Sequence, residues 1–125
     1  MTTAIMPALL SLAEEYLDAW KRKDLQAIGA LVHPQIRLTS PVTEVTGKDA
    51  FLATCEKIFP LLLDVQIHAK FSSQTQAMMV YDFVLKEPIG TTRTANLMTF
   101  ENHLIRSVEL LFDARAFERS AQAKK

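Results

Sequence analysis

The sequence predicts an α+β fold, with helices mainly in the N-terminal half and an antiparallel sheet in the C-terminal half. The sheet is indicated by three apolar runs, 77–85, 92–100 and 104–112, which are rich in β-branched and aromatic residues. Turn residues separate these runs, at 87–90 and at 101–103, so the runs are expected to form a meander. The helices are indicated by apolar residues that recur with helical spacing between positions 9 and 32 and again between 51 and 59.

Two helices are expected at the start of the chain. Asp24 is suited to cap the second, shorter helix, and Pro34 ends it because proline disfavours helical backbone in the residue before it. The apolar face of the first helix consists of Leu9, Ala13, Tyr16, Leu17 and Trp20.

A short strand, a third helix and a longer strand are expected next. Residues 36–40 alternate between apolar and polar types, and residues 46–49 resemble a capped helix start that leads to a stop at Pro60. Residues 65–71 alternate again, so Val65, Ile67, Ala69 and Phe71 are expected to point inward. The predicted order is α-α-β-α-β-β-β-β in one domain spanning residues 1–119, with residues 120–125 as a frayed tail.

The composition bounds the partners and the compartment. Lys+Arg and Asp+Glu both number 14, so there is no net charge to attract nucleic acid or an anionic membrane. The single cysteine, Cys55, excludes an internal disulfide and fits a reducing compartment. The first residues lack the positive start of a signal peptide, and no segment approaches the roughly 20 apolar residues of a membrane span. We therefore expect a cytoplasmic protein without a nucleic-acid or membrane partner.

The run 77–85 is apolar on both faces. If the chain's own helices cover one face, the other needs a second subunit, so we expect a homodimer. Asp82 lies in the middle of this run, where a carboxylate needs a partner or a shifted pKa.

Four segments together resemble the nuclear transport factor 2-like superfamily, which includes ketosteroid isomerases and SnoaL-like polyketide cyclases. They are residues 16–28, 31–34 (Leu-Val-His-Pro), 47–51 (Gly-Lys-Asp-Ala-Phe) and 99–113. The resemblance implies a strongly curved sheet wrapped around the N-terminal helices, a cone-shaped barrel with a pocket, and a homodimer through the open face of the sheet.

The resemblance also implies site residues. Tyr16 matches the helix tyrosine with which ketosteroid isomerases donate to an oxyanion, and Asn96 stands where they hold a second donor. Ser40 stands where they hold an aspartate base, and a serine without an adjacent histidine is a poor proton acceptor. Asp82 becomes the candidate acid–base group if its face is the concave one.

Each candidate also has a plainer interpretation. Tyr16 can be a packed core tyrosine, Asp82 can form an ion pair at a subunit interface or a bond to a neighbouring strand, and Asn96 needs hydrogen-bond partners in any case. The residues expected to line the ligand site are Trp20, Ser40, Met98, Phe100, Leu110 and Phe112.

No metal and no cofactor are expected. The three histidines lack the spacing of metal ligands, and the three glycines form no phosphate-binding loop. The expected function is binding of a small hydrophobic molecule in a cone-shaped pocket. Two classes stay open: an acid–base isomerase, cyclase or hydratase that acts on a carbonyl-containing substrate, and a non-catalytic ligand-binding or dimerisation domain.

Overall fold

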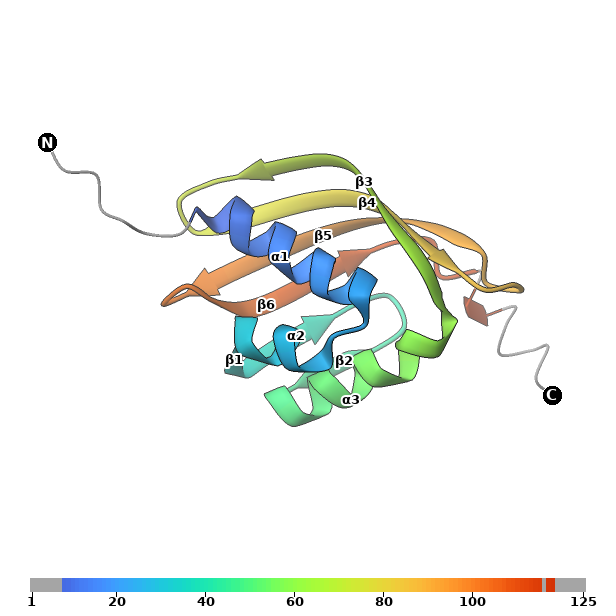
Figure 1. Cartoon of the computed structure of the whole chain (residues 1–125), viewed down its shortest axis with the longest axis horizontal. Coiled ribbons are helices and arrows are strands. Elements are labelled where there is room, and N and C mark those ends of the chain that lie inside the picture. The colour runs from blue at the N-terminus through green and yellow to red at the C-terminus, as the bar shows by residue number, and fades with distance from the viewer. Residues whose placement is uncertain (1–7, 116, 119–125) are drawn as a thin grey trace, which may run out of the picture.

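The computed structural model describes residues 8–115, 117 and 118, and within these it contains three α-helices and one six-stranded sheet (Figure 1). The predicted α+β class is confirmed. The helices are α1 (Leu9–Arg22), α2 (Leu25–Leu31) and α3 (Lys48–Ile58), and a single 3-10 turn (Phe59–Leu61) follows α3. The strands are β1 (Val32–Thr39), β2 (Glu44–Thr46), β3 (Leu62–Ser72), β4 (Gln76–Leu85), β5 (Thr91–Glu101) and β6 (Leu104–Leu111).

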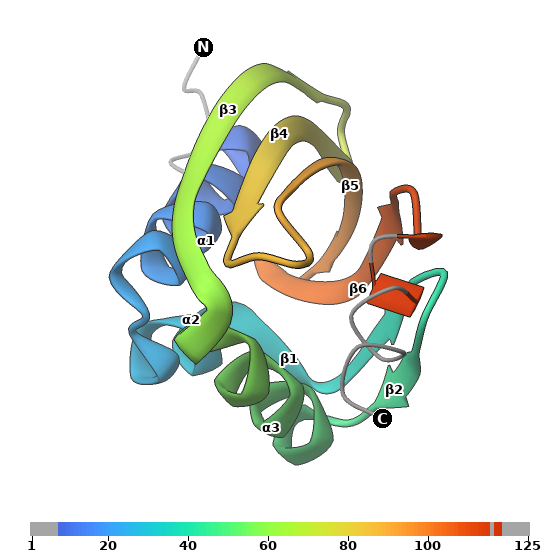
Figure 2. The same cartoon turned by 90° about the vertical axis from the view of Figure 1, so that its right-hand side faces the viewer.

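The strand order is β2-β1-β6-β5-β4-β3, and β1 pairs with β6 in parallel while all other pairs are antiparallel. The sheet is therefore mixed and does not close. Strands β3, β4 and β5 bend strongly, and α1 lies on the inner, concave side of the sheet (Figures 1 and 2). Irregular register in β3, between β5 and β6, and at the start of β1 accompanies this bend, since a bulge bends and twists its strand.

The join between α1 and α2 follows the chemistry of the sequence. Lys23 adopts the left-handed conformation that ends α1, and its N–H group bonds the carbonyls of Ala19 and Trp20. The Asp24 carboxylate accepts a hydrogen bond of 3.0 Å from the Ala27 N–H group, which confirms its predicted role as the cap of α2. The buried face of α1 includes Ala13, Tyr16, Leu17 and Trp20, as the helical spacing predicts.

The turn between β5 and β6 contains Asn102 and His103, which both have positive φ angles, of 52° and 64°. Two left-handed residues in a two-residue hairpin form the type I′ geometry that matches the twist of the strands. The predicted meander of β4, β5 and β6 is thereby confirmed.

The first two strands differ from the prediction. Strand β1 begins at Val32 rather than at residue 36, and Pro34 lies inside a stretch of irregular register between Val32 and Arg37. Proline is tolerated there because a bulge does not need every N–H group. Strand β2 was not predicted, because three residues are too few to show an alternating pattern.

The prediction that Val65, Ile67, Ala69 and Phe71 all point inward is wrong for the last two. The register of β3 shifts between Ile67 and Ala69, so Ile67 pairs with the inward Tyr81 but Ala69 pairs with the outward Val80. One extra residue in a strand exchanges its two faces. Phe71 is accordingly 64% exposed on the outer face.

The end of the chain lies mostly outside the described residues, including the expected tail 120–125. The described helices include none with the length and apolar character that a membrane span requires. The cytoplasmic location stays a prediction.

Gly47, at the start of α3, has a backbone conformation that the turn from β2 requires. Its φ and ψ angles of 96° and 148° belong to a region that only glycine occupies readily, and an added Cβ atom would meet nothing within 4 Å. We expect Gly47→Ala to lower the free energy of unfolding by about 1–3 kcal/mol through backbone strain alone. Urea unfolding monitored by circular dichroism measures this.

Gly29→Ala is the matched control. Gly29 lies inside α2, and an added Cβ atom would contact Leu52 at an ordinary 3.5 Å. Alanine at a helical position is expected to raise stability by up to about 1 kcal/mol. Equal effects of the two substitutions would contradict the backbone explanation.

Candidate functional site

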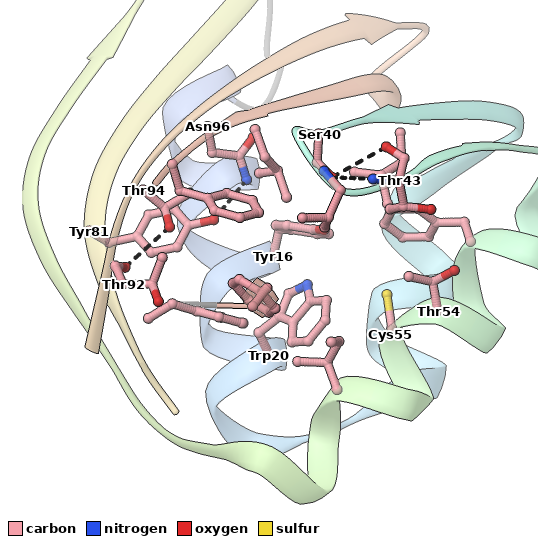
Figure 3. Close-up of a pocket in the computed structure, with 18 residues that line it drawn as sticks. Tyr16, Trp20, Ser40, Thr43, Thr54, Cys55, Tyr81, Thr92, Thr94 and Asn96 are labelled. Atoms are coloured by element: carbon pink, nitrogen blue, oxygen red, sulfur yellow. Dashed lines mark hydrogen bonds between the residues drawn. The ribbon is translucent and has the colours of Figure 1, made fainter. Parts of the chain in front are cut away.

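A pocket of about 110 Å³ lies between the concave face of the sheet and helices α1 and α3 (Figure 3). Helix α1 contributes Tyr16 and Trp20, helix α3 contributes Cys55, and strands β4, β5 and β6 contribute the far wall. The lining residues are Tyr16, Trp20, Leu38, Ser40, Val42, Thr43, Phe51, Thr54, Cys55, Ile58, Tyr81, Phe83, Thr92, Thr94, Asn96, Leu110, Phe112 and Phe117.

Four aromatic rings line the pocket as a connected series. Trp20 packs edge-to-face on Tyr16 and on Phe83, with centroid separations of 6.5 and 5.4 Å, and Phe83 packs on Tyr81 at 5.9 Å. Edge-to-face pairs at these separations are favourable beyond the area that they bury. These contacts fix the shape of one side of the pocket.

Strand β5 supplies three polar side chains to the pocket. Its inward residues Thr92, Thr94 and Asn96 are all buried. The Asn96 amide nitrogen donates to the Tyr81 hydroxyl at 3.1 Å (Figure 3), and the Thr94 hydroxyl donates to the Thr92 carbonyl at 3.2 Å. Two buried side-chain oxygens of the described residues have no hydrogen-bond partner, and both line this pocket: Oδ1 of Asn96 and Oγ1 of Thr92.

The titratable groups of the pocket are neutral. Burial raises the pKa of Tyr81 and the pKa of the Cys55 thiol, each to about 12. Burial also raises the pKa of Tyr16 well above its usual value, and nearby Cys55 and Tyr81 raise it further. The described lining residues include no aspartate, glutamate, lysine, arginine or histidine. At neutral pH the pocket therefore presents hydroxyl, thiol and amide groups but no charge and no carboxylate base.

Ser40 lines the pocket, but its hydroxyl is engaged in the turn between β1 and β2. Its Oγ atom accepts from the N–H groups of Val42 and Thr43 at 3.2 and 3.1 Å and lies 3.2 Å from the Thr43 carbonyl oxygen, to which it donates (Figure 3). This bonding explains the serine before Pro41 as a turn residue.

Asp82 lies on the outer face of the sheet, away from the pocket, so its expected position in the pocket is corrected. It is opposite Arg93 in register, and its carboxylate accepts from the Arg93 guanidinium and contacts His68 Nε2 at 2.9 Å. Arg93 and then His68 lower the pKa of Asp82 to about 2, whereas a desolvated base in the pocket would have a raised pKa. Asp82 therefore forms a structural bond to its neighbouring strands.

The other expected residues divide into two groups. Tyr16, Trp20, Asn96, Leu110 and Phe112 line the pocket, and the Asn96 amide nitrogen donates to the Tyr81 hydroxyl.

Met98 and Phe100 do not line the pocket. They follow Asn96 on the inner face of β5, where side chains fill the space: Met98 is fully buried in the core and Phe100 packs against it.

Sequence reasoning missed Tyr81, Phe83, Thr92 and Thr94 as pocket residues. The signal was present, because Thr92 and Thr94 share the face of Asn96 by simple alternation. Tyr81 and Phe83 share the face of β4 opposite Asp82, by the same alternation. Thr54 of α3, and Val42 and Thr43 of the β1–β2 turn, carried no sequence signal.

A family model described as the SnoaL-like domain matches residues 13–108. The chain belongs to this family. No curated protein matches this SnoaL-like domain.

Solved structures agree with the family. A protein from Kribbella flavida is 26% identical with a TM-score of 0.84, and the match covers 92% of this chain and 94% of that one. A candidate ketosteroid isomerase from the same organism is 15% identical, with a TM-score of 0.76 and coverages of 84% and 77%. A candidate SnoaL-like polyketide cyclase from Shewanella denitrificans is 14% identical, with a TM-score of 0.75 and coverages of 94% and 99%. The last two show the shared fold, and the resemblance drawn from the sequence is confirmed.

The ion pair of Asp82 predicts a specific acid dependence of stability. Because its folded pKa of about 2 lies below the value of about 3.9 expected when unfolded, the unfolded chain binds more protons between these values. The contribution of Asp82 is therefore present above about pH 4 and is lost as the pH falls toward 2. We expect Asp82→Asn to flatten the fall of stability over this interval, measured by urea unfolding at several pH values.

Arg93→Gln removes the partner that lowers the Asp82 pKa most, so it is expected to flatten the same interval. The double variant should add little to either single one, because the two residues form one interaction. An unchanged slope in Asp82→Asn would contradict the ion pair.

Proposed function

We propose that this SnoaL-like domain binds a small, neutral, largely apolar molecule in its pocket and does not carry out acid–base catalysis there. The observation that carries the proposal is the lining itself, which combines an aromatic and aliphatic wall with a few neutral polar groups and no charged side chain among the described residues. Ligand pockets have this composition, with few polar groups that fix orientation.

The isomerase or cyclase alternative requires a proton acceptor that works near neutral pH. Asp82 points away from the pocket, Ser40 bonds its own turn, and the phenols and thiol of the pocket have raised pKa values. None of these groups is an effective base at pH 7. The geometry therefore favours binding over catalysis.

The size of the pocket restricts the ligand. An engineered apolar cavity of about 150 Å³ in another protein binds benzene. The present pocket, about 110 Å³, is of the same order, so a ligand with one ring or a short branched chain fits with little rearrangement.

Neighbouring leucines on β6 give a matched test. Leu110 lines the pocket, whereas Leu111 points to the outer face and is 65% exposed. Leu110→Trp is expected to fill the pocket and weaken binding of toluene at least about tenfold, while Leu111→Trp leaves binding unchanged. Isothermal titration calorimetry with toluene and with phenol measures this. Equal binding by both variants, or no binding of any one-ring compound by the wild type, would overturn the proposal.

We also propose that the outer face of the sheet is the surface of a homodimer. Met78, Val80, Val84 and Leu97 point outward on the central strands and are only partly buried, and Leu111 is exposed beside them. Apolar surface of this kind on adjacent strands is more typical of a covered face than of one in water.

Leu97→Lys tests the dimer. Leu97 is opposite Glu109 in register, so the new lysine gains a partner within its own chain while placing a charge at the expected interface. We expect sedimentation at micromolar concentration to give a dimer for the wild type and for Leu63→Lys, a control at an exposed leucine near the start of β3. Leu97→Lys should raise the dissociation constant at least about tenfold. A wild-type mass of one chain would contradict the dimer.

A further inference from the structure

We infer that the ligand of this pocket carries a neutral hydrogen-bond donor, a hydroxyl group on a small apolar body, and that Oδ1 of Asn96 accepts from it. The inference rests on the proposed binding function and specifies the chemical class of the ligand. It differs from a site that donates to a carbonyl or an oxyanion, because the unpaired atom here is an acceptor.

The Asn96 side chain has one oxygen, Oδ1, without a hydrogen-bond partner among the described residues. Asn96 is 1% exposed and lines the pocket, and its nitrogen donates to Tyr81. A buried polar atom without a partner costs about 1–3 kcal/mol. An amide oxygen can only accept, so the group that completes the site must be a donor.

The Tyr81 hydroxyl, which contacts the Asn96 amide, is a second polar group of the site. Its oxygen accepts from the Asn96 nitrogen, so its own proton remains to be donated. A ligand hydroxyl can both donate to Oδ1 and accept from Tyr81, whereas a ketone or an ether can only accept. The amide and the phenol together therefore match a hydroxyl group better than a carbonyl group.

The second orphaned oxygen, Oγ1 of Thr92, does not weaken this assignment. Thr92 lies four residues from Asn96 along β5, which corresponds to about 13 Å of extended strand. A ligand that fills about 110 Å³ does not span that distance. The Thr92 hydroxyl can either donate or accept a hydrogen bond, so it does not select between a donor and an acceptor on the ligand.

The uncharged lining of the pocket favours a neutral ligand. No described lining residue carries a charge to stabilise an anion, and burial raises the pKa values of Tyr16, Tyr81 and Cys55. The same desolvation acts on a bound phenol and disfavours its ionised form. The ligand therefore binds with its proton in place.

A set of one-ring probes tests the inference on the wild-type protein by calorimetry. Phenol is expected to bind about 5- to 10-fold more tightly than toluene and anisole, which have similar size but no donor. Cyclohexanol should exceed cyclohexanone in the same way. Phenol binding should be constant below the pKa of phenol and fall about tenfold per pH unit above it, because the ionised form is excluded.

Asn96→Leu is expected to bind toluene and phenol equally, since it removes the acceptor and keeps an apolar wall. Gln76→Leu is the matched control, because this amide bonds Thr99 and does not line the pocket. It should keep the preference of the wild type.

The outcomes separate the assignment of a donor ligand from the proposed binding function. If toluene, anisole and phenol bind equally well to the wild type, or if cyclohexanone exceeds cyclohexanol, the assignment of a donor ligand is overturned while the binding function stands. If none of the probes binds, the binding function fails. The wild-type series decides the matter even if Asn96→Leu does not fold.

Discussion

The register between β4 and β5 decides what chemistry the pocket contains. In this register Tyr81 is opposite Thr94 and Asp82 is opposite Arg93, and successive residues of a strand point to opposite faces of the sheet. A shift of either strand by one residue would exchange its faces and place a charged group in the pocket. The turn that joins the strands, with Gly90 at a φ of 74° and its carbonyl accepting from the Leu85 N–H group, helps to fix this register.

The sequence predicted the fold well where periodicity and local chemistry agree. The apolar face of α1, the cap at Asp24 and the hairpin at Asn102 follow from spacing and from side-chain chemistry, and each is present in the structure. The reversal of Ala69 and Phe71 could not be predicted, because a bulge in β3 depends on pairing with β4 rather than on the residues of β3 alone. The candidate site was predicted in part: Tyr16 and Asn96 line the pocket, but the face on which Asp82 lies required the tertiary arrangement.

Polar groups are retained inside this pocket at a cost to the fold. Asn96 and Thr92 each bury an oxygen without a partner, and apolar residues of similar shape would avoid that penalty. Both oxygens belong to the inner face of β5, so among the described residues the cost falls on that strand. Such a local departure from good packing and bonding is typical of a site that has a function.

The open sheet has two free edges, and each is poorly suited to pairing with another strand. Strand β2 is only three residues long, so it offers few backbone groups to a foreign strand. Strand β3 has eleven residues, but two register shifts interrupt its regular geometry and Lys70 adds a charge, paired with Glu14 of α1. Growth of the sheet by edge addition, the route to strand-mediated aggregation, is therefore disfavoured at both ends. The broad outer face is left as the part of the sheet on which a second chain can pack.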